Sequence, residues 1–542
     1  MPDNSQHKIT ALIRQFLWAS SKGSGLAWKK WTALCLPKGW GGLGFRDLTC
    51  FNQAFLAKQA WRILSSPNLL LSRVLLGKYC QGNSFLEAKH SSLSSWGWRS
   101  ILWGCSLLLS GLQRVVGNGW NINPFEAQWI PIVSNPCKGR GLSDLCPAMR
   151  VEHFIHSSSR SWRLDLFTLF FPAHVIPHIL SIHIPHEDLE DKIVWGPTKS
   201  GQYSVKSGYK QALIRQFPDF CRPDPDWTVW NRPWHFKIPP KWTSFLWKCL
   251  HNILPVKHEL KKRGLTIDVL CSRCSAYEET IEHLFFDCPL SQRVWRESIL
   301  GLDFGSGTPL SFFSWFKRWV EQITDVEILF HSIALLWAIW LQRNSAEFRG
   351  AILPTEHILQ TAREVLSTLL SPSTYVAHDI SYSDSIVHHS VANQVILQNA
   401  ATSLADYLQQ RIVVDGSWTS VMARTGLAWV WLDNADNVVK QEAILGPHML
   451  SPQQTEAAAV LQALRWASQQ GIKSLFLQTD CLVLVQLMHH FDQDEDWQLH
   501  SILHDILLCT KQFVYVVLEK VDRAVVQPAH FLAHSVRLSF ES

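Results

Sequence analysis

The 542-residue chain is too long for one ordinary domain, so we expect three or four. Its 47% hydrophobic and 18% charged residues exclude bulk disorder and are typical of a globular protein with a core. The net charge of +5 is unevenly spread, because residues 411–542 carry nine Lys and Arg against fourteen Asp and Glu. The first 410 residues are therefore the basic part of the chain.

The thirteen cysteines are an odd number and show no spacing typical of disulfides. The first residues lack the basic and apolar regions of a secretory signal. The longest apolar run, 328–341, is interrupted by His331 and is too short to span a bilayer. We therefore expect an intracellular protein, nuclear or cytoplasmic, that has no membrane partner and whose cysteines are either buried or bound to metal.

The first 62 residues are basic and helical in pattern and include a glycine-rich loop at 34–47. Such a loop can hold phosphate only in a strand–loop–helix setting that ends in Lys followed by Ser or Thr, and this ending is absent, so a plain turn is favoured. Asn118-Gly119 between apolar residues predicts a tight hairpin, and 193–205 predicts a second hairpin leading into a helix.

Segment 192–275 has fifteen Lys and Arg against five Asp and Glu, with tryptophans between them. Basic residues among aromatics suit a polyanion such as nucleic acid. For any single tryptophan, a place in the core is the favoured alternative. The six tryptophans are Trp195, Trp227, Trp230, Trp234, Trp242 and Trp247.

Helices are expected at 240–252 and through 311–348, and residues 371–400 lose periodicity and become polar, which is typical of a linker. Beyond it, three strands joined by hairpins precede alternating helices and strands. The predicted strands are 411–415, 426–432, 438–445, 473–479 and 513–518. The predicted helices are 452–470, one from Asp480, 497–510 after an acidic loop at 492–496, and one from Pro528. This order predicts a mixed sheet of about five strands covered by helices.

Four potential metal ligands cluster in the middle of the chain, as Cys271-x2-Cys274-x8-His283-x4-Cys288. Two thiolates two residues apart can hold one Zn²⁺ from a tight turn, and the His–Cys pair completes a tetrahedron. Four ligands leave no open position, so a structural zinc ion is favoured over a hydrolytic one. Unmetallated cysteines are the alternative.

Three carboxylates occupy positions that suit one site in the last quarter. Asp415 and Asp480 lie at the ends of predicted strands, and Glu456 lies early in a helix. Singly, they could be a turn residue, a helix N-cap and a first-turn charge. Together they predict a cage for two Mg²⁺ or Mn²⁺ ions, which activate water and neutralise charge during phosphodiester hydrolysis.

The last quarter resembles a type 1 ribonuclease H domain, on the evidence of Asp415-Gly-Ser-Trp, Ser451-Pro-Gln-Gln-Thr-Glu456 and Thr479-Asp480-Cys. It most resembles the domain that ends plant non-long-terminal-repeat retrotransposon reverse transcriptases. Residues 192–209, 238–247 and 271–295 resemble the zinc-binding region of those proteins, and 39–61 resembles the segment after their polymerase core. The resemblance covers about nine-tenths of the chain.

The resemblance implies a multidomain protein with mostly helical N-terminal and zinc-binding regions and an α/β ribonuclease H-like domain. The expected divisions are a helical remnant (1–110), a connector (111–190), the zinc-binding domain (191–300), a helical region (301–370), a linker (371–410) and the ribonuclease H-like domain (411–542). No Asp-Asp pair in an apolar hairpin occurs in the sequence, so we expect no polymerase activity.

The last helix departs from the family pattern at two positions. Val526 replaces an asparagine, and His530 replaces the fourth carboxylate. A neutral imidazole suits Mg²⁺ poorly and adds no negative charge, which affects the second metal. Asp415, Glu456 and Asp480 carry over as ligands, and His530 carries over as a catalytic position only.

Two functions follow as expectations. The first is a metal-dependent endonuclease that cuts the RNA strand of an RNA–DNA hybrid, with the basic upstream region adding affinity. The second is a catalytically impaired nucleic-acid-binding remnant of a retrotransposon reverse transcriptase, which His530 and the acidic balance of 411–542 favour. A purely structural protein would leave both metal-like clusters unexplained. The sequence makes no prediction of oligomeric state.

Overall fold

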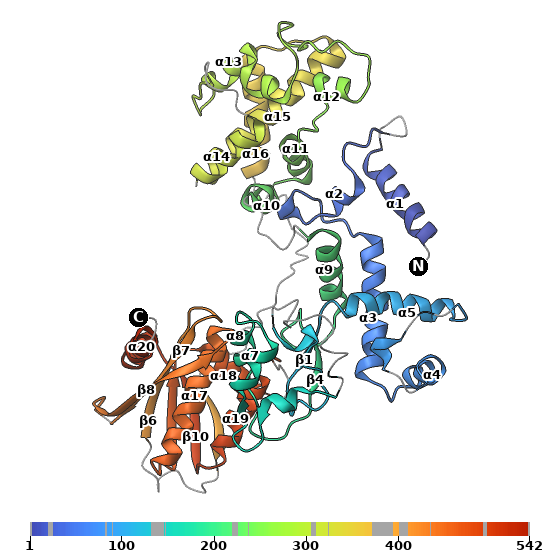
Figure 1. The fold of residues 1–542 in the computed structure, drawn as a ribbon. Coiled ribbons are helices and arrows are strands. Elements are labelled where there is room, and N and C mark those ends of the chain that lie inside the picture. Colours follow the sequence, from blue (N-terminus) through green and yellow to red (C-terminus); the bar gives the residue numbers. More distant parts are fainter. Residues whose placement is uncertain are drawn as a thin grey trace. The chain divides into compact units, whose positions relative to one another are not determined.

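Each of the two units of the computed structural model combines two stretches that are far apart in the sequence (Figure 1). The first unit comprises residues 1–52 and 213–385, and the second comprises 53–212 and 386–542. The structure describes residues 3–19, 25–81, 84–88, 90, 92–131, 146, 148–218, 226–236, 238–304, 311–323, 325–370, 394–399, 410–433, 435–491 and 496–539. Most of the predicted linker 371–410 and of the predicted acidic loop 492–496 lies outside the described residues.

The second unit ends in a six-stranded mixed sheet with the order β5-β10-β9-β6-β7-β8. Strands β6, β9 and β10 run parallel, whereas β6–β7, β7–β8 and β10–β5 are antiparallel pairs. The strands are β5 (Gln394–Asn399), β6 (Gln410–Ser417), β7 (Arg424–Leu432), β8 (Val438–His448), β9 (Ser474–Thr479) and β10 (Tyr515–Lys520). The predicted mixed sheet is confirmed, with one more strand than the five expected: β5 lies within the segment predicted as a linker.

Helices cover both faces of this sheet (Figure 1). On β6, Ile412 and Val414 join the core formed with α17 and α19, whereas Val413 packs with Val526 of α20 on the other face. A strand buried on both faces explains the continuous apolar run in the sequence. The helices are α17 (Pro452–Gln469), α18 (Leu482–His489), α19 (His500–Thr510) and α20 (Arg523–Leu538).

The last helix begins five residues before the predicted start at Pro528. Pro528 lies inside α20, where it removes one backbone donor. The helix nevertheless extends over the preceding residues because Val526 is fully buried against the sheet. Burial of Val526 therefore moves the start of the helix upstream of Pro528, although proline in a sequence favours a start at its own position.

The hairpins predicted at Asn118-Gly119 and at 193–205 are wrong, whereas the helix predicted after the second one is α9 (Val205–Gln216). Strand β1 (Leu112–Val115) pairs antiparallel with β4 (Lys192–Trp195), some eighty residues away in sequence. The Asn118-Gly119 turn instead wraps the carboxylate of Asp191, which accepts hydrogen bonds from the amides of Gly117, Gly119 and Asn121 at 2.8–2.9 Å. The partly buried carboxylate of Asp191 gives these turn amides the acceptor that a hairpin partner would otherwise provide.

The connector also binds the sheet domain within this unit. Asp505 of α19, 3% exposed, accepts hydrogen bonds from the His183 ring at 2.8 Å and from the His186 amide at 2.9 Å. The Trp497 indole donates to the Thr198 carbonyl. The other elements of this unit are α4 (Leu70–Tyr79), α5 (Trp96–Leu108), β2 (Ile155–His156), β3 (Ser161–Trp162), α7 (Leu164–Phe170) and α8 (Ile176–Leu180), and α3 (Leu48–Ser65) and α9 (Val205–Gln216) cross its boundary with the first unit.

The described elements of the first unit are mainly helices around a core rich in aromatic side chains. Its α15 is long and apolar enough to cross a membrane by length and composition, and 61% of its most apolar window is buried inside the protein. Packing within this core therefore accounts for the apolar sequence of α15. The helices are α1 (Asp3–Leu17), α2 (Trp31–Cys35), α10 (Trp227–His235), α11 (Pro240–Leu250), α12 (Lys257–Lys262), α13 (Pro289–Glu297), α14 (Phe312–Gln322), α15 (Val326–Arg349) and α16 (Thr355–Leu370).

Three of the six tryptophans of the basic segment are buried. Trp195, Trp242 and Trp247 are at most 4% exposed, whereas Trp227 is 44% exposed. The glycine-rich loop contributes a carbonyl at Gly41 that accepts a hydrogen bond from the Trp247 indole at 2.9 Å. Gly41 has a φ of +78°, so it serves as a turn glycine. The plain-turn interpretation of this loop is thus confirmed.

Candidate metal centres

The three predicted carboxylates converge at one edge of the six-stranded sheet. Asp415, Glu456 and Asp480 each offer an oxygen atom, and these atoms all lie within 4.8 Å of one another. Asp415 is a β6 residue, and Asp480 follows β9 directly. Because β6 and β9 are parallel with Val413 opposite Gln478, their carboxyl ends bring Asp415 and Asp480 together.

Glu456 reaches the same place because α17 starts close to β6. The helix begins after Ser451, whose hydroxyl accepts from the Gln454 amide as an N-cap. A Cβ on Gly416 would lie 2.8–2.9 Å from atoms of Thr455, so only glycine allows this approach. The Thr479 hydroxyl, at the end of β9, lies 3.5 Å from the Glu456 carboxylate.

The electrostatics of this cluster favour a bound cation. Burial, followed by the charges of Asp415 and Asp480, holds the pKa of Glu456 well above its usual value. Burial likewise raises the pKa of Asp415, with the Asp480 charge adding to the effect and His530 opposing it. Carboxylates that destabilise one another when ionised gain from a divalent cation between them, and hard oxygen donors fit Mg²⁺ or Mn²⁺.

The two departures in the last helix have different surroundings. His530 lies beside the cluster, with its Nδ1 atom 3.1 Å from Oδ2 of Asp415 and a side chain 30% exposed. Val526 of α20 is fully buried against β6 and β7. The position of His530 thus remains at the site, whereas Val526 is a packing residue.

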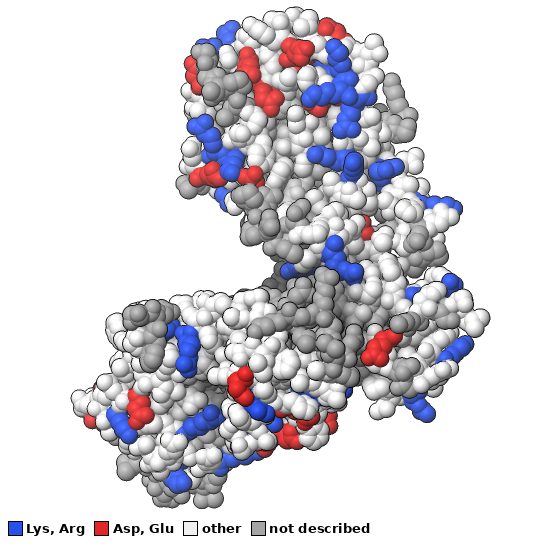
Figure 2. Space-filling view, viewed as in Figure 1, with Lys and Arg blue, Asp and Glu red and all other residues white. Residues whose placement is uncertain are grey.

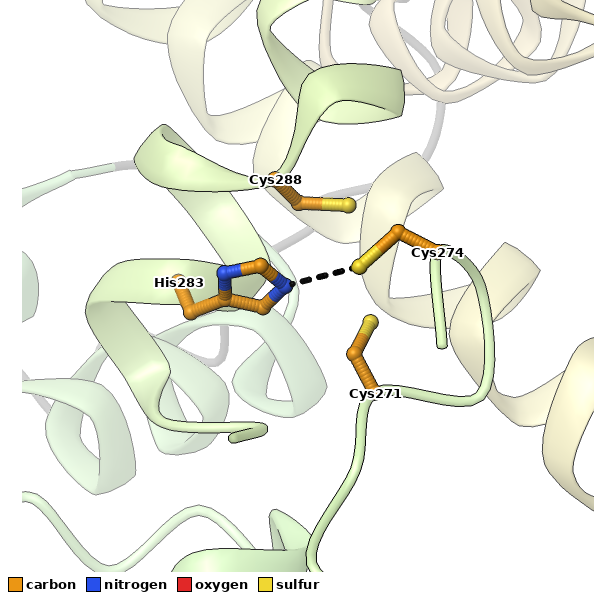
Figure 3. A group of neighbouring side chains, drawn as sticks. All are labelled: Cys271, Cys274, His283 and Cys288. Carbon is orange, nitrogen blue, oxygen red and sulfur yellow. Dashed lines mark hydrogen bonds between the residues drawn. The ribbon is translucent and has the colours of Figure 1, made fainter. Parts of the chain in front are cut away.

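The sulfur and nitrogen ligands form a second cluster in the first unit (Figure 3). The ligand atoms of Cys271, Cys274, His283 and Cys288 lie within 4.8 Å of one another, and Cys274 Sγ is 3.3 Å from His283 Nε2. The first two come from a tight turn, His283 opens a π-helical turn (His283–Asp287), and Cys288 precedes α13. Three thiols and an imidazole, mostly buried, fit tetrahedral Zn²⁺.

The pKa values of Cys271 and Cys288 are shifted in opposite directions. A hydrogen bond from Cys271, assisted by the charge of Arg273, lowers the pKa of Cys288 to about 7, although burial opposes the shift. The same hydrogen bond and burial raise the pKa of Cys271 to about 11. A shared proton between two buried sulfurs is the arrangement that a metal ion would replace.

A basic surface lies on the same unit as the sulfur cluster. Figure 2 shows Lys and Arg side chains over the region of α11 and α12. The exposed run Lys261, Lys262 and Arg263 ends α12 there. Arg263 also donates to the Trp28 carbonyl at 2.7 Å, which fixes its position.

Two family models match the chain in the same order as the clusters. The model described as "zinc-binding in reverse transcriptase" matches residues 203–295, and the model described as "Reverse transcriptase-like" matches residues 413–536. The first match contains the sulfur cluster. The second contains all three carboxylates and His530.

Two relatives come from Arabidopsis thaliana. An uncharacterized mitochondrial protein is 42% identical over 125 residues, which are 23% of this chain and 81% of that protein. A protein named "putative ribonuclease H protein" is 27% identical over 318 residues, which are 54% of this chain and 48% of that protein. The chain thus spans about half the length of the latter relative.

Similar solved structures are ribonucleases H1. That of Halobacterium salinarum NRC-1 is 18% identical, with a TM-score of 0.23, and covers 24% of this chain and 97% of its own. LC11-RNase H1 in complex with an RNA/DNA hybrid is 16% identical, with a TM-score of 0.23, and covers 24% of this chain and 99% of its own.

Proposed function

Because this chain belongs to the plant retrotransposon reverse-transcriptase-like proteins, with a zinc-binding segment followed by a ribonuclease H-like domain, we propose that it is a metal-dependent RNA–DNA hybrid endonuclease. The observation that carries the proposal is the convergence of Asp415, Glu456 and Asp480 within 4.8 Å. Its substrate is the RNA strand of a hybrid. Polymerase activity is not part of the proposal.

The residues of the carboxylate cluster have distinct parts in this proposal. Asp415 and Asp480 would hold divalent ions from two strand ends, and Glu456 would add a third ligand and orient the attacking water. Bound Mg²⁺ or Mn²⁺ supplies the activation of water and the neutralisation of charge on the phosphate. His530 contacts one oxygen of Asp415 through its Nδ1 atom.

In this proposal substrate affinity comes from the basic part of the chain upstream of the acidic ribonuclease H-like domain. The run Lys261, Lys262 and Arg263 is exposed and suits contacts with backbone phosphates. Such contacts are independent of base sequence, as expected for a hybrid nuclease. The cysteine–histidine cluster holds a structural Zn²⁺ that orders the chain before α13.

A catalytically impaired nucleic-acid-binding protein is the second candidate function. The observation that favours it is His530 in contact with Asp415. Imidazole is a poor ligand for Mg²⁺ and a better one for Mn²⁺. The protein would then bind hybrids and cut them slowly, with more activity in Mn²⁺ than in Mg²⁺.

A cleavage assay separates the two functions. The full chain is incubated with a labelled RNA–DNA hybrid in Mg²⁺ and in Mn²⁺. We expect cleavage that Asp415→Asn reduces at least about 100-fold, because one carboxylate ligand of the metal would be lost. His530→Asp should raise the Mg²⁺ rate by restoring a fourth carboxylate. The control is Asp436→Asn. Asp436 is an exposed carboxylate of the same domain, in the turn between β7 and β8, and it forms an ion pair with Arg411.

The outcomes assign the function. Cleavage that disappears in Asp415→Asn and persists in Asp436→Asn supports the nuclease. Hybrid binding without cleavage in either metal contradicts it and supports the impaired protein. Recovery of cleavage in His530→Asp would then identify the fourth ligand as the defect.

A further inference from the structure

Arg273 is a buried arginine between two ligands of the cysteine–histidine cluster. Arg273 lies between Cys271 and Cys274 in the tight turn and is only 3% exposed. A guanidinium stays charged in proteins, and a buried charge without a counter-charge is strongly unfavourable. The surroundings of Arg273 must therefore supply a negative charge.

Hydrogen bonding does not provide this counter-charge. The Nη1 atom of Arg273 donates to the hydroxyl of Ser291 at 2.5 Å, and this hydroxyl is neutral. Its Nε and Nη2 atoms are buried and have no hydrogen-bond partner in the part of the chain that the structure describes. The N–H of Nε and both N–H bonds of Nη2 are thus left without an acceptor among the described residues.

The nearby carboxylate is already matched by another arginine. Glu279 accepts three hydrogen bonds from Arg343 at 2.6–3.1 Å, in a pair that is at most 3% exposed. Glu347, which accepts a hydrogen bond from the neighbouring Ser272, is paired with Lys257 at 3.0 Å. Each of these two pairs sums to zero charge, so Arg273 is left as an excess positive charge.

The remaining charges that act on Arg273 belong to the cluster itself. Its guanidinium interacts electrostatically with the sulfur atoms of Cys288, Cys271 and Cys274. Three thiolates and a neutral imidazole around Zn²⁺ carry a net charge of −1. One guanidinium neutralises this charge, whereas three neutral thiols would leave Arg273 unmatched.

We propose that Arg273 is the counter-charge of the zinc centre, a positioning residue whose charge offsets the net negative charge of the metal-bound thiolates. The inference rests on the proposed zinc site. Zinc binding and burial of Arg273 stabilise each other: the metal makes the sulfurs anionic, and the guanidinium offsets the resulting charge.

The first measurement is Zn²⁺ affinity of the full chain by competition with a chelator of known affinity. Arg273→Met keeps an unbranched apolar side chain and removes the charge, and we expect Zn²⁺ affinity to fall about 10- to 100-fold, as for other partners of metal ligands. Arg273→Lys, which retains the charge, should lose less. The control is Arg296→Met, which removes an exposed arginine from α13 and should leave the affinity unchanged.

A second background separates charge compensation from packing. Cys274→His turns the centre into two thiolates and two imidazoles, which around Zn²⁺ is neutral. In this background Arg273→Met should no longer weaken Zn²⁺ binding, because no net charge remains to be offset. An arginine needed only for packing would cause the same loss in both backgrounds, and that result would overturn the inference.

Circular dichroism measures the folding of the variants in the wild-type and Cys274→His backgrounds. If the Arg273→Met protein is unfolded in the wild-type background and folded in the Cys274→His background, charge compensation is supported. Failure to fold in both backgrounds indicates a packing role and overturns it. A wild-type chain that binds no zinc would refute the zinc site itself, whereas equal losses in a zinc-binding protein refute the role of Arg273 alone.

Discussion

At the scale of single residues, Glu456 has the surroundings least compatible with a permanent negative charge. Burial and the neighbouring Asp415 and Asp480 hold its pKa well above its usual value of 4.5. In the unfolded chain this carboxyl ionises near pH 4.5. Without metal, the folded protein therefore binds a proton more tightly than the unfolded chain, and stability falls as pH rises above that value.

Glu456→Gln should therefore stabilise the metal-free ribonuclease H-like domain at pH 7. The gain should shrink as pH falls toward 4.5, where both states of the wild-type carboxyl are protonated. Thermal unfolding in a chelator between pH 5 and 8 measures it. A stabilisation independent of pH would contradict this origin. Mg²⁺ should stabilise the wild type and have less effect on the variant.

At the scale of elements, two glycines let helices approach the sheet closely. Gly416 allows α17 to start beside β6, and Gly426 of β7 allows α20 to pack, since a Cβ there would lie 1.9 Å from the Ala533 carbonyl. Both glycines lie in strands, where the sequence alone suggests only that glycine weakens the strand. Glycine is needed there because the backbone of another element comes close, and only the tertiary structure shows that approach.

Gly416→Ala should reduce hybrid cleavage and destabilise the domain by about 1–3 kcal/mol, because α17 must move away and Glu456 moves with it. The matched control is Gly77→Ala in α4. Nothing lies within 4 Å of its Cβ, and alanine is the better helix former by about 1 kcal/mol. Unfolding and cleavage measured together check the prediction. Unchanged cleavage in Gly416→Ala would show that Glu456 is not needed at its present distance.

The edge strand β5 is the element that the sequence placed in a linker. It pairs with β10, and its Val395 is 9% exposed in the core. A fragment of residues 405–542 lacks this strand, whereas 386–542 includes it. We expect the shorter fragment to be less stable by about 2 kcal/mol, from the lost burial of Val395, and to aggregate through the free edge of β10. Equal stability in urea unfolding would contradict this.

At the scale of the whole molecule, the two metal clusters lie in different units. The sulfur cluster lies in the first unit and the carboxylate cluster in the second. Each cluster has its own hydrophobic core. Loss of one metal should therefore affect the unit that holds it.

Zinc analysis of the full chain should find about one ion, lost in Cys271→Ser. Because Cys271, His283 and Cys288 are at most 5% exposed, we expect this loss to lower the unfolding temperature of the first unit. The transition of the second unit should stay in place, which calorimetry can resolve. Ser106→Ala, an exposed serine in the second unit, is a neutral control. A single transition that shifts as a whole would contradict separate units.

Local sequence determined much of this protein: the alternation of strands and helices after residue 410, the spacing of Cys271 and Cys274, and the carboxylates Asp415, Glu456 and Asp480 at element ends. These follow from patterns within a few residues, where chemistry and periodicity act directly. Only the tertiary structure decided that β1 pairs with β4, that β5 closes the sheet edge and that Arg273 lies buried among sulfurs. Such contacts depend on the fit between segments that are distant in sequence. A local sequence pattern does not encode which distant backbone or charged group a segment will contact.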